Sequence, residues 1–230
     1  MNIELAQECQ DVLTARADFY RLLSSVFYRE LDDNDIVQWA SLKVDPESEN
    51  DDLISGFKAL SRCMALRGPD ARTDFATDYA RVFLAAGIFE GDAACPYESV
   101  YTSEDGLVMQ DARDEVVAAM RSEGIKITED VHEPEDHISF ELEFMARLSE
   151  ATREKLGSRD SRECERLIAV QEEFIHAHLL NWIDAWGERI ETLARFPFYP
   201  AVFRVTRGFL VEDVALLREL AGLMTLDEAA

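Results

Sequence analysis

Positive charge is scarce in this sequence of 230 residues, and lysine is its rarest source. Only four lysines occur, and the 23 basic residues face 47 acidic ones, which gives a net charge of −24. A surface this acidic repels nucleic acid and anionic lipid, so we expect neither as a partner. A basic partner is favoured instead, although the same charge could serve solubility alone, and composition does not decide between the two.

Long apolar runs are missing as well. No stretch of about 18 apolar residues could cross a membrane. The first five residues carry Glu4 and none of the basic residues that open a secretory signal. We therefore expect a cytoplasmic protein that is not embedded in a membrane.

Cysteine is sparse and scattered. The four cysteines, which form no C-x-x-C pair, are Cys9, Cys63, Cys95 and Cys164. This spacing argues against a disulfide framework and against a thiolate zinc site, and it predicts reduced thiols. A glycine-rich phosphate loop is also lacking, so the sequence offers no motif for nucleotide binding.

Strand patterns are absent, because no pair of alternating runs flanks a hairpin turn. Helical periodicity covers the chain instead, as where Phe19, Leu22 and Val26 share one helical face. The sequence predicts a single compact all-α domain over residues 1–230. Helices are expected at about 3–29, 51–66, 106–124, 134–156, 161–186 and 200–223. Two further helices are expected, a short one that follows a turn at Asp32 to Asp35 and runs through Trp39, and one around Phe75 to Phe83.

The stretch 86–104 holds two glycines and a proline, and it predicts a long ordered loop between helices. Loops of this length inside a compact domain are uncommon and often functional. Pro96, Tyr97, Glu98 and Tyr101 would give the loop a rigid, amphipathic surface. Tyrosines beside a proline can also simply cover a core, and the pattern alone does not separate these interpretations.

Two histidine spacings suggest a metal site. His132 and His137 are five residues apart with a proline between them, whereas zinc proteases need H-E-x-x-H on one helix. Glu129-x-x-His132 and Glu173-x-x-His176 match the E-x-x-H spacing of di-iron bundles. The first match precedes the proline, and the second lies on the polar side of its helix. A metal-dependent helical-bundle enzyme is therefore kept as the alternative function.

Pro134 stands where a proline in the first turn opens a helix. On the wheel of that helix, His137 and Glu141 fall on or beside the apolar face and can meet as i and i+4 neighbours. Asp136 falls outside this face. Burying a carboxylate is costly unless it is paired. The two side chains therefore either form a buried pair that fixes the helix or line a groove, and the sequence leaves both open.

Four short motifs, in this order, resemble those of the TorD/DmsD family of molybdoenzyme maturation chaperones. Residues Asp78 to Phe83 resemble the helix that enters the family's tyrosine loop, and Pro96 to Tyr101 resemble the loop itself. Glu133 to His137 is similar to the family's E-P-x-D-H signature. Phe174 to Trp182 resembles its H-L-x-x-W helix. The resemblance extends over residues 10–222.

This resemblance implies an all-α domain of the TorD-like type, with no catalysis and no cofactor. It implies that the chain binds a twin-arginine signal peptide and the apo catalytic subunit of a molybdopterin oxidoreductase, until the molybdenum cofactor is inserted and the enzyme is exported. Carried over motif by motif, the residues expected to bind the leader are Tyr79, Phe83, Pro96, Tyr97, Glu98, Tyr101, Asp136, His137 and Glu141.

The chemistry of these residues fits such a leader. Guanidinium groups prefer carboxylates in bidentate geometry, so the three acids of the set would take the arginine pair. The aromatic rings would take the apolar stretch that follows, provided that the tyrosine loop and the helix after Pro134 converge on one cleft. A helical adaptor with no preference for the arginine pair is a third interpretation. The client enzyme and the formation of a homo-oligomer stay open.

Overall fold

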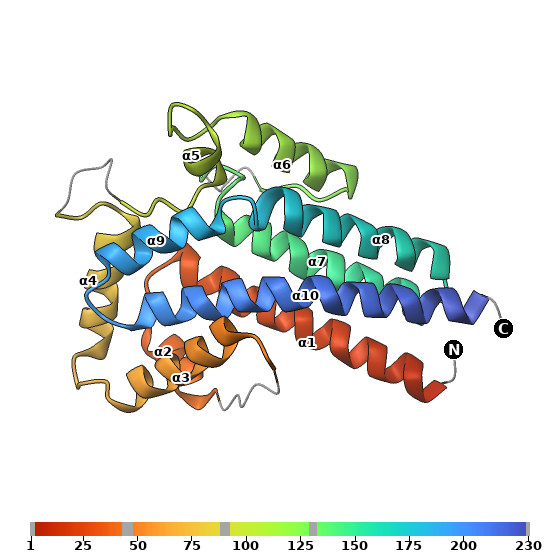
Figure 1. Ribbon diagram of the computed structural model, residues 1–230, viewed down its shortest axis with the longest axis horizontal. Coiled ribbons are helices and arrows are strands. Elements are labelled where there is room, and N and C mark those ends of the chain that lie inside the picture. Colours follow the sequence, from red (N-terminus) through yellow and green to blue (C-terminus); the bar gives the residue numbers. More distant parts are fainter. Residues whose placement is uncertain (1–2, 43–47, 88–92, 129–132, 229–230) are drawn as a thin grey trace.

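Helices account for almost all of the regular structure of the chain (Figure 1). The computed structural model describes residues 3–42, 48–87, 93–128 and 133–228. The elements are α1 (Ile3–Tyr28), α2 (Asp33–Ser41), α3 (Asp51–Ala65), α4 (Ala71–Phe83), α5 (Glu98–Thr102), α6 (Asp111–Ser122), α7 (Ile138–Gly157), α8 (Ser161–Phe174), the π-helical segment η2 (Ile175–Leu179), α9 (Ile183–Leu193) and α10 (Phe198–Glu228).

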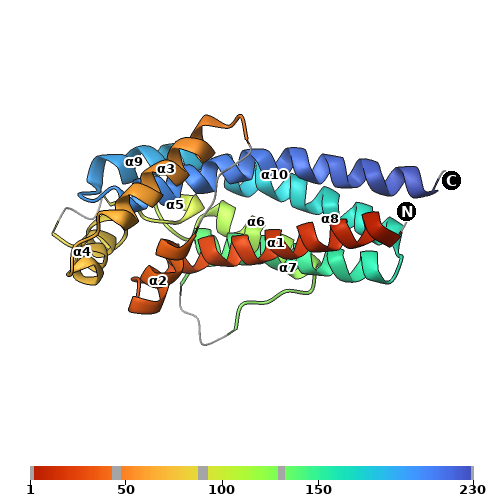
Figure 2. The ribbon, with the colours of Figure 1, turned by 90° about the horizontal axis from the view of Figure 1, so that it is seen from below.

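Helices α1, α7, α8 and α10 run along the length of the molecule (Figures 1 and 2). Helix α1 packs along α7, and α10 packs along both α3 and α8. Helices α2, α3 and α4 gather at the end of the molecule where α1 finishes at Tyr28, while α5 and α6 cover one side. The start of α1 and the end of α10 lie at the opposite end of the molecule (Figure 1).

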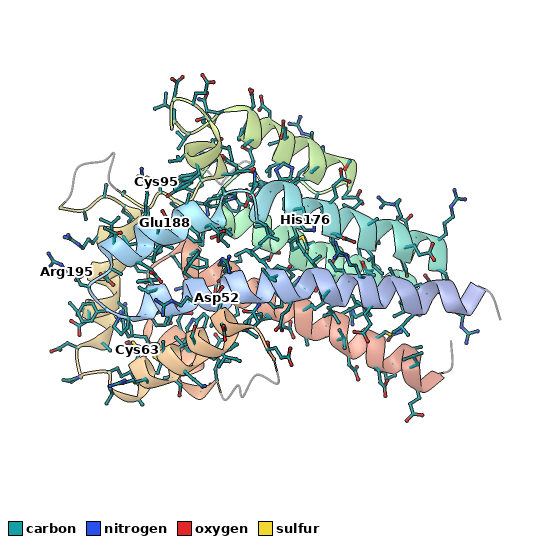
Figure 3. All side chains as sticks on the ribbon, viewed as in Figure 1. Asp52, Cys63, Cys95, His176, Glu188 and Arg195 are labelled. Carbon is teal, nitrogen blue, oxygen red and sulfur yellow. The ribbon has the colours of Figure 1, made fainter. Side chains whose placement is uncertain are left out.

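One continuous apolar core runs through these helices and fills the spaces between them (Figure 3). The inward stripe of α1 includes Tyr20, Leu23 and Phe27, all fully buried. The ring of Phe27 lies 4.9 Å from that of Trp186 on α9, edge to face. Aromatic pairs in this geometry add to the stability gained from burial. Of the residues predicted to share one face of this helix, Val26 is buried, whereas Phe19 and Leu22 are half-buried and pack against the core.

A buried arginine ties the long helices together. Arg16 of α1 donates to both carboxylate oxygens of Asp213 on α10, at 2.6 and 2.7 Å. The same guanidinium donates to Ser149 on α7 and to Gln171 on α8, at 3.0 and 2.9 Å. A buried charge is tolerated only with such complete pairing. One side chain thus links α1, α7, α8 and α10.

The all-α prediction is confirmed for the described residues, in which the only β-pairing is an isolated antiparallel bridge between Tyr97 and His137. Several predicted helix boundaries need correction. The helix expected from Gly106 begins at Asp111, because Gly106 adopts a φ of +63° that an α-helix does not allow. The helix expected over 161–186 is divided by η2. Among the described helices, none combines the length and apolar character needed to span a membrane.

Candidate functional site

The tyrosine loop and the segment before α7 lie directly against each other. Tyr97 and His137 form the antiparallel bridge. The Glu98 amide donates to the Asp136 carbonyl at 3.0 Å, and the Ile138 amide donates to the Pro96 carbonyl at 2.9 Å. The two segments that the sequence analysis expected to converge are therefore joined through their backbones.

This pairing shifts the start of α7. The helix begins at Ile138 and not at Pro134 as predicted, because residues 134–137 form a turn that pairs with the loop. His137 is the N-cap, with φ −72° and ψ 132°, and its Nδ1 accepts a hydrogen bond from the Ser139 amide at 3.1 Å. The His137 ring therefore makes its hydrogen bond within the first turn of α7 and does not pair with Glu141. Burial lowers the pKa of His137 to about 3, so the ring is neutral.

The segment expected as a loop over 86–104 contains the short helix α5, and Asp136 holds its first turn. One carboxylate oxygen of Asp136, Oδ2, accepts from the Ser99 amide at 2.9 Å. A carboxylate at a helix N-terminus satisfies amides that have no partner within the helix. Asp136 is fully buried, contrary to the prediction that it falls outside the apolar face. The part of the loop at 88–92 lies outside the described residues.

Glu98, the first residue of α5, faces the π-helical segment. Its Oε2 lies 3.0 Å from Nδ1 of His178, and its Oε1 accepts from the side-chain amide of Asn181. The indole of Trp182 in turn donates to the His178 carbonyl at 2.7 Å. In η2 the Leu180 amide bonds to the Ile175 carbonyl, five residues back. This wider turn brings His178, Asn181 and Trp182 together below α5, and such turns recur at functional sites.

Glu98, Asp136 and Glu141 form a buried acid cluster. Glu141 is fully buried, and neither of its carboxylate oxygens has a hydrogen-bond partner among the described residues; the same holds for Oδ1 of Asp136. Burial, and then the charges of Glu98 and Asp136, raise the pKa of Glu141 well above its ordinary range. Glu141 is therefore a neutral acid, which explains how it tolerates burial without a cation.

The remaining predicted residues lie beneath the surface. Tyr79 and Phe83 of α4 are buried, and the Tyr79 hydroxyl donates to the Phe27 carbonyl at 3.0 Å. Pro96 is buried as well. The half-buried ring of Tyr101 stacks on Trp182, with centroids 5.3 Å apart. Of the nine predicted residues, Tyr97 and Tyr101 are half-buried and the other seven are buried.

Three accessible aromatic rings surround His137, and we call Tyr28, Tyr97 and Phe140 the aromatic patch. Their centroids lie 6.2, 5.1 and 5.7 Å from that of His137, in the same order. Tyr28 is 44% exposed, and the other two rings are half-buried. The patch is thus an apolar surface formed by the end of α1, the tyrosine loop and the first turn of α7.

One exposed acid contacts this patch, and a second lies two residues beyond Tyr28 in the chain. The Tyr97 hydroxyl donates to Glu133, and Glu30 follows Tyr28 in the chain. Burial raises the pKa of the Tyr79 hydroxyl, and the charges of Glu133 and Glu30 raise it further. Glu30 also lines a hollow on α4 together with Arg81 and Arg195. Sequence reasoning selected neither acid, nor Tyr28 and Phe140. Glu133 was within the quoted signature, but nothing in the pattern marked the last turn of α1.

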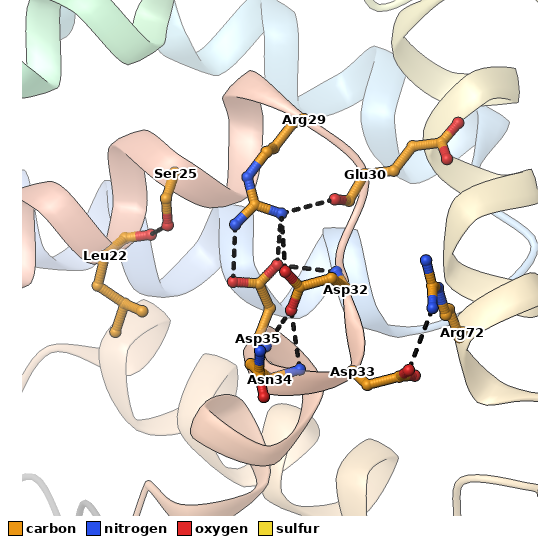
Figure 4. A network of polar contacts seen from close by, with 9 residues as sticks. All are labelled: Leu22, Ser25, Arg29, Glu30, Asp32, Asp33, Asn34, Asp35 and Arg72. Carbon is orange, nitrogen blue, oxygen red and sulfur yellow. Dashed lines mark hydrogen bonds and ion pairs between the residues drawn. The ribbon is translucent and has the colours of Figure 1, made fainter.

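A polar network fixes the chain where it leaves α1 (Figure 4). Arg29 donates to both carboxylate oxygens of Asp35, at 2.7 and 3.0 Å, and to the Glu30 carbonyl at 3.1 Å. Asp32 caps α2 by accepting from the Asn34 and Asp35 amides. The direction in which Tyr28 and Glu30 are presented is therefore set by the sequence that follows them.

The metal alternative finds no support in the geometry. Within the described residues, no three His, Cys, Asp or Glu side chains gather closely enough to hold a metal ion. His176, labelled in Figure 3, is exposed on η2, and His178, two residues on, pairs with Glu98. Glu129 and His132 lie outside the described residues. His137 and His178 thus serve other roles, the first as a helix cap and the second as the partner of Glu98.

Comparison with known proteins gives consistent matches along the chain. The family model described as "Nitrate reductase delta subunit" matches residues 50–187. The chain is 30% identical to chaperone protein TorD of Vibrio cholerae serotype O1 over 224 residues, which cover 94% of this chain and 98% of that protein. It is 29% identical to chaperone protein TorD of Photobacterium profundum, over 88% of this chain and 94% of the relative.

Proposed function

The chain belongs to the TorD/DmsD family, whose members are chaperones and not enzymes, and we propose that it binds the twin-arginine leader and the immature catalytic subunit of a molybdoenzyme. On this proposal it works in the cytoplasm and holds its client until the cofactor is inserted. The observation that carries the proposal is the aromatic patch, whose Tyr97 contacts the exposed Glu133, on a chain with a net charge of −24.

The patch suits both parts of such a leader. The carboxylates of Glu30 and Glu133 are exposed, and each can pair with a guanidinium group without leaving water. The apolar stretch that follows the arginines can lie across Tyr28 and Phe140, whose rings are 5.7 Å apart. Tyr97 lies between the two parts, since its hydroxyl contacts Glu133 while its ring packs on His137.

The buried residues of the predicted set position this surface. Asp136 and Glu98 hold α5 and thereby the loop that carries Tyr97. His137 forms the centre of the patch, and Tyr79 lies below it. On this proposal Asp136→Ala is a poor test of binding, because it removes the acceptor for the Ser99 amide and destabilises α5 itself.

Calorimetry with a synthetic leader peptide tests the proposal through exposed residues. We expect Glu133→Gln and Tyr28→Ala each to weaken binding by roughly three- to tenfold, the loss typical of one charge-assisted or aromatic contact. Glu188→Gln, an exposed acid on α9 (Figure 3), is the matched control and should leave the affinity unchanged. Equal affinities in all three variants would contradict this site.

A second peptide separates chaperone from adaptor. A leader whose two arginines are replaced by glutamine keeps its apolar stretch but loses the charges that pair with Glu30 and Glu133. We expect it to bind more weakly to the wild-type protein, and to be insensitive to Glu133→Gln. If both peptides bind equally well, the chain has no specificity for the arginine pair and the adaptor interpretation gains support.

A further inference from the structure

A cavity of about 600 Å³ lies between α3, α4 and the start of α10, and it shares no residue with the aromatic patch. Its lining includes the apolar residues Ala71 and Phe75, which are buried, and Phe196, which is half-buried. Its volume falls within the range of about 300–1,000 Å³ that is usual for small-molecule sites. Cys63, labelled in Figure 3, also lines it and is half-buried.

The wall of this cavity is firmly held. Both carboxylate oxygens of the buried Asp78 accept backbone amides of the turn before α10, from Arg195 at 2.9 Å and from Phe196 at 3.1 Å. Phe75 lies on the same helix as Asp78 and is buried. The cavity is therefore shaped before any ligand arrives, which lowers the cost of ordering on binding.

The charge at the rim is opposite to that of the molecule. Lys58, Arg62 and Arg67 line the cavity together with a single acid, Asp74, although acids outnumber bases about two to one in the whole chain. Lys58 is one of only four lysines. All three cationic residues are exposed. A local excess of positive charge beside an apolar lining complements a ligand that is both apolar and anionic.

These three cations form no ion pair with the described residues, although the chain is rich in acids. Among the described residues, no carboxylate lies within ion-pair distance of Lys58, Arg62 or Arg67. Arg67 donates only to a carbonyl of its own helix end. By contrast, Arg72 on the next helix pairs with Asp33, and Arg166 pairs with Glu123. The rim cations thus remain available to a ligand.

We infer that this cavity binds a compact amphipathic anion, that is, a small molecule with an apolar body and a carboxylate, sulfonate or similar group. The apolar body would contact Phe75, Phe196 and Ala71. The anionic group would lie at the rim, against Lys58 and Arg62. This inference does not depend on the leader site, because it uses different residues.

Fluorescence titration with anilinonaphthalene sulfonate, an apolar anion, tests the inference. We expect one saturable site per chain. The double variant Lys58→Gln/Arg62→Gln should weaken binding by about tenfold or more, because it removes two charge-assisted contacts. Arg121→Gln/Lys126→Gln is the matched control, because it removes the same two residue types from exposed positions in the last turn of α6 and in the segment that follows it. It should change the affinity by less than about twofold.

A neutral probe and a thiol readout complete the test. Phenylnaphthylamine, which has the same rings without the sulfonate, should bind both double variants alike. Bound anilinonaphthalene sulfonate should slow the alkylation of Cys63 by N-ethylmaleimide. The alkylation rate of Cys95 in the same chain is the internal reference and should not change. Equal sulfonate affinity in both double variants, the absence of a saturable site, or unchanged alkylation of Cys63 would each overturn the inference.

Discussion

At the scale of single residues, Glu141 is the most unusual group in the molecule. Its carboxyl is fully buried beside two other acids, and its pKa in the folded protein is raised well above the ordinary value of 4.5. Above that pH the unfolded chain has released a proton that the folded protein still holds. Stability therefore falls as the pH rises, by up to about 1.4 kcal/mol per pH unit, until the folded carboxyl ionises.

Glu141→Gln should remove this dependence, because an amide of nearly the same shape holds no titratable proton. We expect the free energy of unfolding of the variant, relative to wild type, to grow between pH 4.5 and pH 7 by roughly 1–3 kcal/mol. Urea unfolding followed by circular dichroism at several pH values measures it. Glu143→Gln, at a half-exposed position paired with Arg147, should show no such growth. A pH-independent difference for Glu141→Gln would contradict a buried neutral acid.

The predicted site residues show what sequence can say at this scale. Helical spacing placed Glu141 at the apolar face, and the structure buries it. The same spacing suggested a pair with His137, but His137 caps α7 and the neighbours of Glu141 are other acids. Glu98 lies more than forty residues away in the chain, so no local pattern could reveal its approach. The exposure of Tyr28 could not be predicted either, because it depends on how the other helices pack around the end of α1.

At the scale of elements, η2 is the segment on which the loop geometry depends. Its wide turn directs His178 to Glu98, whereas His176, two residues earlier, faces solvent. His178→Ala should therefore leave a buried carboxylate oxygen without its partner and cost roughly 1–3 kcal/mol of stability. His176→Ala, the matched change in the same segment, should cost less than about 0.5 kcal/mol. Thermal and chemical unfolding of both variants gives the comparison, and similar losses would refute this role of His178.

Most helices could be predicted from the sequence, because the spacing of apolar residues along a helix is a local signal. The exceptions arise from contacts across the chain. Helix α5 has only five residues, and its first turn depends on Asp136, far away in sequence. Helix α7 begins at Ile138, and not at the predicted Pro134, for the same reason. The sequence predicts one continuous helix across the π-helical segment, because a single wider turn changes the spacing of the buried apolar residues very little.

At the scale of the whole molecule, the net charge of −24 has two opposite consequences. Salt screens the repulsion among the carboxylates, so the melting temperature of the free protein should rise with added NaCl. The same screening should slow capture of a basic leader peptide, by about tenfold or more between 20 and 500 mM NaCl. Thermal melts and stopped-flow fluorescence measure the two trends.

The peptide in which both arginines are replaced by glutamine is the control for the second trend. Its capture should depend much less on salt, because its positive charge is reduced. If the two peptides respond to salt alike, or if capture of the arginine leader is insensitive to salt, the acidic surface does not attract the leader from a distance. The melting trend would stand independently of that result.

The placement of the chain ends has a practical consequence. Helix α1 has 26 residues, so the aromatic patch lies about 39 Å from Ile3, and the end of α10 lies at that same far end of the molecule (Figure 1). A fluorescent protein fused to either end, or a tether that fixes either end to a sensor chip, would leave the patch unobstructed. Such reporters could follow peptide capture on an otherwise unmodified surface.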